Sequence, residues 1–436
     1  MVDSRVERNT VLLVAAVQFI NILDFMMVMP LGPDFSRSLG IPTSHLGYIG
    51  GAYTLSAALS GLIGAFFLDR FDRRRALAVA LAGLVVSTAL GGFATDFETL
   101  LAARVLAGAF GGPATSISLA IISDVIPPER RGKALGTVMM AFSFSSVLGV
   151  PIGLRLALIA GWRTPFFAVA AAGLVIAIMA IALLPSMRGH IVAGAPRVRV
   201  ADFVQLLENR TVLISYLMTA LAMMGMFILV PNIAAYVQGN LGYPRNYIDL
   251  LYFAGGVISL FTMRGVGMLV DRFGAFRIGA FGTFFMSTVI YVGFINYELV
   301  AAAFDALTHP LVALIGVFRP TAVGELTGHS GVLLVFVGFM FSSAFRNVSY
   351  NTLTTRVPGP RERARFMSLQ SSVQHASSAF GAFLSSRILS EGPNHSLIGI
   401  YTVAFISIGL CLSVPPLLYV VEKRVLLGTR SPSAIA

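Results

Sequence analysis

Residues 267–274 read GMLVDRFG, and residues 69–75 read DRFDRRR. Each of these charged segments stands between two long apolar stretches of a sequence that is otherwise suited to lipid. The two aspartates, Asp69 and Asp271, are about 200 residues apart. A charged turn that recurs at this spacing predicts a membrane protein built from two related halves.

The composition indicates a protein that uses lipid as its main solvent. Of 436 residues, 56% are hydrophobic and 12% are charged, whereas a soluble domain carries roughly 25% charged residues. The chain is therefore predicted to be a polytopic membrane protein. Its one cysteine, Cys411, excludes an internal disulfide and argues against a cysteine-based metal site. We expect no metal and no cofactor.

The placement of arginine predicts the orientation in the membrane. The formal net charge is +11, and the basic residues, almost all arginine, cluster in alternate loops. They form no basic patch interleaved with aromatic residues, so nucleic acid is not an expected partner. Because loops rich in arginine and lysine remain in the cytoplasm, we expect a multi-pass protein of the cell inner membrane with both termini cytoplasmic.

Hydropathy divides the chain into twelve expected spans. A span needs roughly 20 apolar residues, and six such stretches occur on each side of a more polar cytoplasmic linker at 185–210. The N-terminal half covers 1–184 and the C-terminal half covers 211–421, followed by a cytoplasmic tail at 422–436. The expected spans lie near 11–31, 45–68, 76–94, 98–122, 135–158, 164–184, 211–237, 246–270, 277–296, 331–354, 367–388 and 397–420.

The second half is longer than the first by about 30 residues, which hydropathy assigns to an insertion at 297–330. The apolar run within it is interrupted by Asp305, His309 and Pro310. A thirteenth span would place the arginine-rich loop at 361–365 on the outer side, against the charge bias. We therefore expect an interfacial or re-entrant helix on the outer face, serving as a spacer or as a lid.

These features resemble the major facilitator superfamily over nearly the whole chain apart from the insertion. That family's loop motif between helices 2 and 3 reads Gly-x-Leu-x-Asp-Arg-x-Gly-Arg-Arg, and 267–274 fits it closely. The first copy departs from it, with Ala65 and Phe67 in place of glycine and leucine and Asp72 in place of the second glycine. The resemblance implies that a cytoplasmic gating latch is formed by Asp69, Arg70, Arg73, Gly267, Asp271, Arg272 and Gly274.

Two further motifs point to one branch of that superfamily. Helix 4 carries Arg104 followed by several glycines, which resembles the pattern of proton-coupled members. Helix 5 carries Gly149, Pro151 and Gly153, which resemble the Gly-x-Pro-x-Gly element of the drug/proton antiporter branch. Glycine and proline there give a bent, smooth helix face. The resemblance implies an all-α fold of twelve transmembrane helices in two six-helix halves.

Two ionisable residues stand out because a charge inside a membrane helix costs several kcal/mol. Asp24 lies roughly 10–12 Å from the outer end of helix 1, counted along the helix rise, and Arg104 lies at a comparable depth in helix 4. The resemblance places helices 1, 4, 7 and 10 around a central cavity, so we predict that the two residues pair or approach closely. Moving a guanidinium toward or away from a carboxylate changes whether the carboxylate holds a proton, which suits proton coupling. A static pair that joins two helices is the alternative.

Weaker candidates for a substrate cavity are polar, aromatic or methionine residues on other helices. Methionine and aromatic side chains suit a promiscuous pocket because they repack around varied shapes, but they also serve as ordinary packing. Arg155 could instead extend to the membrane surface, and Gln374 and His375 could belong to a hydrogen-bonded helix seam. The candidates are Asn21, Arg155, Tyr216, Met223, Asn232, Tyr236, Arg346, Gln374 and His375.

These observations favour a monomeric secondary transporter that works by alternating access and exports small amphipathic compounds in exchange for protons. The first alternative is a selective transporter of a sugar, organic anion or other metabolite, with Arg104, Arg155 and Arg346 as ligands. A membrane-embedded enzyme using His375 or His309, or a receptor that keeps the fold without transport, is more remote. The sequence has no metal-binding spacing and no phosphate-binding loop, so we expect no enzymatic activity.

Overall fold

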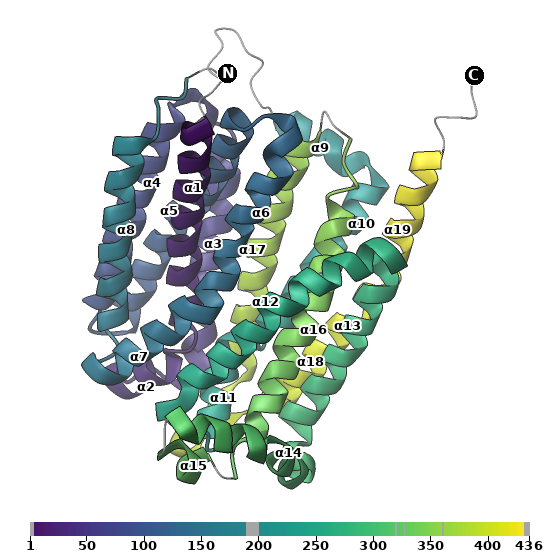
Figure 1. Cartoon of the computed structure of the whole chain (residues 1–436). Helices are drawn as coiled ribbons and strands as arrows, with labels where there is room; N and C mark the ends of the chain where they lie inside the picture. The colour runs from purple at the N-terminus through teal and green to yellow at the C-terminus, as the bar shows by residue number, and fades with distance from the viewer. Residues whose placement is uncertain (1–3, 189–199, 319–320, 327, 360–361, 431–436) are drawn as a thin grey trace.

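The computed structural model describes residues 4–188, 200–318, 321–326, 328–359 and 362–430. Residues 4–188 form one helical bundle and residues 200–430 form a second beside it (Figure 1). The first helix begins and the last helix ends at the same end of the molecule, which also carries the loops at 69–75 and 271–277. We call this the arginine-rich end and the opposite one the arginine-poor end. Parts of the predicted linker (189–199) and tail (431–436) lie outside the described residues.

The first bundle contains six spanning segments, because in lipid a chain must satisfy its backbone hydrogen bonds within each helix. The fifth segment is interrupted by a π-helical turn at Ser145–Gly149, which ends two residues before Pro151, a residue that lacks a backbone N–H donor. A short helix, α2 (Gly32–Leu39), lies at the arginine-poor end. The spanning helices are α1 (Ser4–Val28), α3 (Leu46–Gly64), α4 (Arg73–Gly92), α5 (Phe97–Val125), α6 (Pro128–Phe144) with α7 (Val150–Ala160), and α8 (Thr164–Leu183).

The second bundle repeats this plan and begins after a short helix, α9 (Val200–Glu208). Its last two spans are joined at the arginine-poor end by a small antiparallel hairpin of β1 (Ser390–Glu391) and β2 (Leu397–Ile398). The spanning helices are α10 (Arg210–Phe227) with α11 (Ile233–Gly239), α12 (Ile248–Phe273), α13 (Ala275–Ile290), α16 (Gly331–Thr354), α17 (Arg363–Ile388), and α18 (Ile400–Leu412) with α19 (Val414–Arg430).

Twelve spans are present among the described residues, as the sequence predicts, although one of them is more polar than the others. Eleven of the described helical segments are long and apolar enough to cross a membrane. The twelfth, α17, has 26 residues but is rich in serine and also contains glutamine and histidine. It packs between α3 and α10, so its polar side chains meet protein more than lipid.

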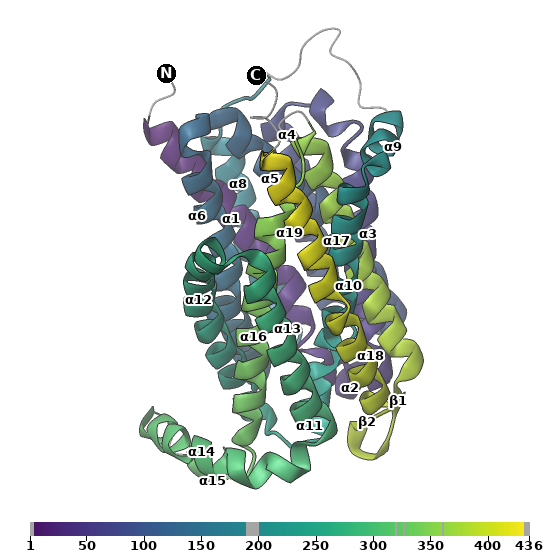
Figure 2. The same ribbon diagram turned by 90° about the vertical axis from the view of Figure 1, so that its right-hand side faces the viewer.

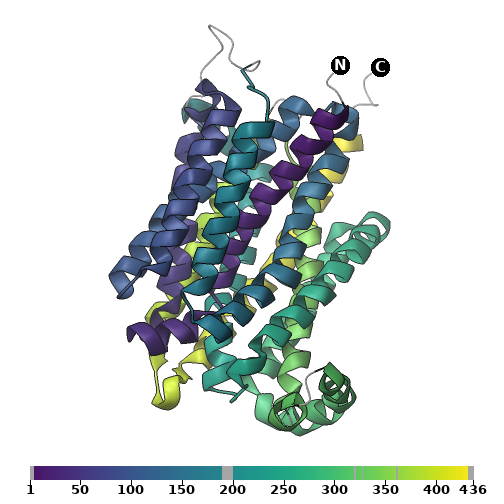
Figure 3. The same ribbon diagram turned by 60° about the vertical axis from the view of Figure 1, so that its left-hand side comes forward.

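The insertion forms two helices, α14 (Tyr297–Phe318) and α15 (Thr321–Leu326). Both lie across the arginine-poor end, and α14 extends away from the bundle (Figure 2 and Figure 3). One contact fixes α14 to the start of α16: an oxygen of Asp305 accepts hydrogen bonds from the Gly331 N–H at 2.5 Å and from Ser330 at 3.1 Å. Leu299 and Leu307 of α14 are 82% and 70% exposed, as expected of a helix that rests on the membrane surface.

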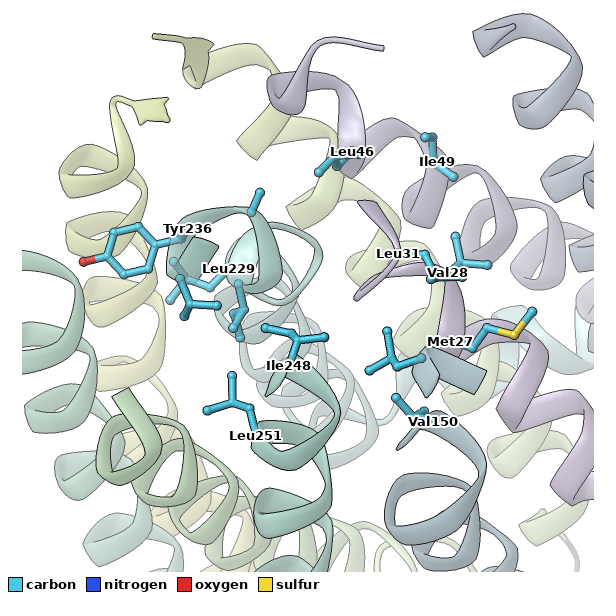
Figure 4. Close-up of a cluster of buried hydrophobic side chains, with 14 of the residues drawn as sticks. Met27, Val28, Leu31, Leu46, Ile49, Val150, Leu229, Tyr236, Ile248 and Leu251 are labelled. Atoms are coloured by element: carbon cyan, nitrogen blue, oxygen red, sulfur yellow. The ribbon is translucent and has the colours of Figure 1, made fainter. Parts of the chain in front are cut away.

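The two bundles are joined at one end and diverge between α6 and α12 at the other, where Phe66 still contacts Phe203 of α9, with ring centres 5.4 Å apart. Toward the arginine-poor end a single hydrophobic cluster runs through both bundles, and Figure 4 shows Val28, Leu31, Val150, Leu229, Ile248 and Leu251 within it. Toward the arginine-rich end each bundle has hydrophobic clusters of its own. There α6 and α12 diverge (Figure 1). The molecule is therefore closed at the arginine-poor end and open at the arginine-rich end.

Polar contacts between the bundles complete the closed end. Asp34 of α2 accepts hydrogen bonds from Arg245, the shortest at 2.7 Å. Arg37, one turn further along α2, also pairs with Asp34 at 3.1 Å. The Thr43 N–H donates to Glu391 of the hairpin at 3.0 Å. These contacts tie α2 and its neighbours to the second bundle.

Close packing of α3 against α17 holds the two bundles together, and Gly47 shows how closely the two helices approach. A Cβ atom built on Gly47 would lie 2.2 Å from the backbone oxygen of Ala382 in α17. A backbone atom cannot move aside without shifting its helix. We predict that Gly47→Ala forces the two bundles apart at the arginine-poor end and raises the population that is open there.

The measurement is the distance distribution between spin labels on two exposed residues at that end, Thr95 and Ser390, with Cys411 replaced by serine. Gly61→Ala is the matched control, because Gly61 lies in the same helix and a Cβ there would meet nothing within 4 Å. Gly47→Ala should add a longer distance that Gly61→Ala lacks. Identical distributions in both variants would contradict the prediction.

Candidate functional site

Asp24 of α1 and Arg104 of α5 form a two-pronged ion pair in the first bundle. The Arg104 Nη2 lies 2.9 Å from one carboxylate oxygen of Asp24, and Nη1 lies 3.1 Å from the other. Asp24 is 0% exposed and Arg104 is 1% exposed. Parallel hydrogen bonds between a guanidinium and a carboxylate are the strongest form of this contact. The structure thus brings together the two residues that the sequence predicts to pair.

Side chains from two further helices hold this pair. Thr88 of α4 donates to Asp24 at 2.8 Å, so the carboxylate accepts from two helices. The Arg104 guanidinium lies 4.9 Å from the centre of the Tyr53 ring in α3, a cation–π distance. Four of the six spans in this half, α1, α3, α4 and α5, therefore meet at this ion pair.

A chain of polar groups extends from the pair toward the arginine-rich end. Tyr53 donates to Asn21 at 2.8 Å, and Asn21 donates to Thr115 of α5 at 2.6 Å. Thr115 in turn donates to Gln18 at 3.3 Å. Gln18, Asn21 and Asp24 are spaced by three residues, which places them on one face of α1. Sequence reasoning missed Gln18, Tyr53, Thr88 and Thr115, although the three-residue spacing along an apolar helix was a usable signal for the first of them.

A second cluster gathers three of the predicted cavity residues in the other half. Arg346 of α16 donates to the backbone oxygen of Ala222 in α10 at 3.2 Å. One turn along α16, Tyr350 contacts the Met223 sulfur at 4.0 Å and accepts from Gln374 of α17 at 3.3 Å. Met223, Arg346 and Gln374 therefore lie around Tyr350. We call these four residues the Arg346 cluster.

Other predicted cavity residues bond to their immediate neighbours and lie outside both groups. Tyr216 donates to the backbone of Phe366, Asn232 donates to Ser385, and Tyr236 donates to the backbone of Gly293, at 3.1, 2.9 and 2.9 Å. His375 contacts the backbone oxygen of Ser371 in its own helix at 2.9 Å. Arg155 is exposed on α7. Such residues occur both in helix packing and in cavity walls. Residue type alone therefore did not distinguish the side chains that pack between helices from those that line a cavity.

The predicted latch residues make contacts within their own halves in this open arrangement. Arg73 pairs with Asp124 at 3.2 Å, and Asp271 pairs with Arg356 at 3.3 Å. Arg272 lies over the neighbouring Phe273 ring, Gly274 begins the turn with a φ of 89°, and Arg70 is exposed. A Cβ on Gly267 would meet nothing within 4 Å. The side chain of Asp69 lies outside the described residues.

Asp72, where the first loop departs from the family motif, caps the start of α4. Its carboxylate accepts from the N–H groups of Arg74 at 2.9 Å and Met187 at 3.2 Å and from Ser186. Burial alone would raise the pKa of Asp72, but these hydrogen bonds and the nearby Arg188 outweigh it and lower the pKa to about 2. An acidic N-cap explains why glycine is not needed here.

The glycines of the helix 5 motif pack against other helices of the same half. A Cβ on Gly149 would lie 2.7 Å from Leu23 of α1. Pro151 is the second residue of α7, which follows the π-helical turn, and Gly153 is buried on the same segment. The motif therefore bends the fifth span where it contacts α12.

A cavity of about 760 Å³ lies away from the Asp24–Arg104 pair and the Arg346 cluster, against α4 and α5 near the arginine-rich end, where Arg70 and Asp72 also line it. It is mainly apolar, with arginines at its rim, and Phe71, Val79, Phe110, Pro113, Arg75 and Arg188 line it. Val79 is 66% exposed, so the cavity opens on the outer surface of the bundle and does not reach Asp24. Within the described residues, no three His, Cys, Asp or Glu side chains gather closely enough to hold a metal ion.

The buried pair generates a stability prediction. Asp24→Asn leaves the Arg104 charge buried without its carboxylate, which costs about 3–5 kcal/mol. Asp24→Asn combined with Arg104→Gln removes both charges and should recover part of that loss. The measurement is the thermal unfolding midpoint in detergent, with Asp96→Asn as the control because Asp96 is a solvent-facing N-cap. A double variant as unstable as the sum of the single variants would argue against a coupled pair.

The comparisons with known proteins agree with this architecture. Residues 14–382 match the family model of the Major Facilitator Superfamily. An uncharacterized MFS-type transporter of Bacillus subtilis (strain 168), YceJ, is 31% identical over 180 residues, which are 41% of this chain and 46% of that protein. A chloramphenicol resistance protein of Streptomyces lividans is 26% identical over 262 residues, which are 60% of this chain and 66% of that protein. The matched stretch is thus less than two thirds of either relative.

The likeness in fold extends over nearly the whole chain. The crystal structure of a D-xylose-proton symporter superposes with a TM-score of 0.69, covering 96% of this chain and 98% of that one at 15% identity. At that identity the likeness establishes the fold alone. With twelve helices in two bundles and a family match over residues 14–382, the chain belongs to the Major Facilitator Superfamily of membrane transporters.

Proposed function

We propose that this transporter exports small amphipathic compounds from the cytoplasm in exchange for protons, as a monomer in the cell inner membrane. The observation that carries the proposal is the buried Asp24–Arg104 pair. Among the described residues, Asp24 is the one acidic side chain that is 0% exposed. The other buried acidic residues, Glu7, Asp72 and Asp249, are 8%, 5% and 7% exposed and lie in the first turn or at the N-cap of a helix. An acidic group retained at such cost inside a membrane protein is a functional candidate by default.

Proton exchange at Asp24 gives the pair two states. When the carboxylate is charged, Arg104 and Thr88 hold it and join α1, α4 and α5. When it is protonated, the attraction to Arg104 is lost and the guanidinium is free to reorient toward Tyr53 or another acceptor. A compound that binds one of these states more tightly shifts the equilibrium between them. Binding of the compound and release of the proton would then be linked.

Alternating access would use the two ends of the molecule in turn. The closed end, held by Asp34 and Arg245, would face the outside, and the open end would face the cytoplasm, as the arginine bias predicts. In the opposite state the latch residues Asp69, Arg70, Arg73, Asp271 and Arg272 would make contacts between the halves. The similarity to a chloramphenicol resistance protein supports the export direction.

The test is accumulation of chloramphenicol and of several fluorescent dyes in efflux-deficient cells, with and without a protonophore. We expect wild type to lower the cell content and the protonophore to abolish the effect. Asp24→Asn should lower the rate of protonophore-sensitive export by roughly tenfold or more, because the substitution removes the ionisable group itself. Arg104→Lys should lose part of it, because lysine keeps the charge and not the two-pronged geometry.

Asp96→Asn, expressed at a matched level, is the control because it alters an aspartate at the surface of the same half. Protonophore-sensitive export by Asp24→Asn at the wild-type rate would refute the proton-coupling role. If wild type changes the accumulation of none of these compounds, the proposal that it exports a broad range of amphipathic compounds is wrong. Selective transport of a metabolite then becomes the preferred hypothesis.

A further inference from the structure

The second half contains a buried cation without an acidic partner. Arg346 is 4% exposed. Among the described residues, the contacts of its guanidinium are the backbone oxygen of Ala222 and the sulfur of Met286. Its Nε has no hydrogen-bond partner there. A backbone oxygen and a thioether provide no opposite charge, and a buried unpaired charge is costly.

The sequence confirms that this half has no carboxylate to offer at that depth. The spans formed by α10 with α11, by α13, by α16 and by α17 contain no Asp or Glu. In α12 the acidic residues are Asp249, near the first turn, and Asp271, near the last. Glu422 lies far along α19 and accepts from the N–H of Ala275 at 2.6 Å. Among the described residues, Arg346 therefore has no counter-ion within its own half.

The contrast with Arg104 is informative because the two arginines occupy related settings. Arg104 contacts the first span of its half and lies beside Thr88 of the third span. Arg346 contacts α10, the first span of its half, and Met286 of α13, the third span. The first half supplies a carboxylate in this setting, and the second half supplies neutral groups.

We propose that Arg346 binds an anionic group, such as a carboxylate, on the compound that this protein transports. This inference rests on the proposed transport function and adds to it the chemical class of the compound: a small amphipathic anion. Arg346 lies fifteen residues from the start of α16, which is roughly 22 Å from that end. It is therefore on the side where the two halves have separate hydrophobic clusters.

The Arg346 cluster provides the remaining contacts for such an anion. Tyr350 lies one helical turn from Arg346 on α16, and its hydroxyl accepts from the amide of Gln374 of α17, which is only half-buried. Met223 adds an adaptable apolar surface. A carboxylate held by Arg346 with a ring against Met223 would satisfy both the charge and the apolar part of an amphipathic anion.

The experiment measures equilibrium binding of naphthoate and of its neutral amide, naphthamide, to the full chain in nanodiscs of zwitterionic lipid, with empty nanodiscs as the blank. We expect wild type to prefer naphthoate. Arg346→Met should weaken naphthoate binding by roughly 10- to 100-fold, the range for a charged hydrogen bond, and leave naphthamide unchanged. Arg346→Lys should fall between them.

Arg264→Met is the matched control, because Arg264 is an exposed arginine on α12 of the same half. Gel filtration and the unfolding midpoint establish that each variant is folded. If Arg346→Met does not fold, the proposal is tested by the affinities of wild type and of Arg346→Lys for naphthoate relative to naphthamide. The proposal is overturned by equal affinity of wild type for the two probes, by unchanged naphthoate binding in Arg346→Met, or by an equal loss in Arg264→Met.

This assay needs no gradient, so it separates the anion site from proton coupling. Asp24→Asn should keep its preference for naphthoate while losing protonophore-sensitive export. If export proves independent of protons while the preference for naphthoate persists, the anion-site proposal is supported and the proton-coupling proposal is refuted. If neither probe binds wild type, the anion site falls while the export assay still judges the transport function.

Discussion

A charge placed in hydrocarbon must find an opposite charge or a dense set of hydrogen-bond partners, and this requirement governs how the protein is built. Most of its arginines avoid the problem by lying in loops at one end. Asp24 meets the requirement by pairing with Arg104 and by accepting a hydrogen bond from Thr88, and these contacts bring α1, α4 and α5 together. Arg346 meets it only in part. The two halves therefore share a helix plan and differ in electrostatics.

Apolar contact decides which end of the molecule is closed. One hydrophobic cluster crosses between the halves at the arginine-poor end, and the clusters at the other end stay apart. Opening the closed end would expose part of the shared cluster, at a free-energy cost that grows with the apolar area. Closing the other end would have to bury apolar area of similar size to offset that cost.

The sequence was sufficient for the helix plan, the family and the Asp24–Arg104 pair, because long apolar runs and isolated charges are unambiguous in lipid. It was insufficient where side-chain direction matters. Tyr216, Asn232 and Tyr236 were candidates by residue type, yet each bonds to a neighbouring helix. In a helix that is apolar all round, no hydrophobic period identifies the face that meets a cavity. Asp72 departs from the family motif, and only the structure shows that it caps α4.

The attachment of α14 gives the lipid a mechanical role. Asp305 joins this surface helix to the first residue of α16, and α16 carries Arg346 and Tyr350 further along its length. We expect α14 to rest on the lipid headgroups, and a helix is stiff along its axis, so a tilt of α16 would drag α14 through them. The lateral pressure and the thickness of the membrane would then contribute to the free-energy difference between the two conformations. The bilayer would thus influence the transport cycle.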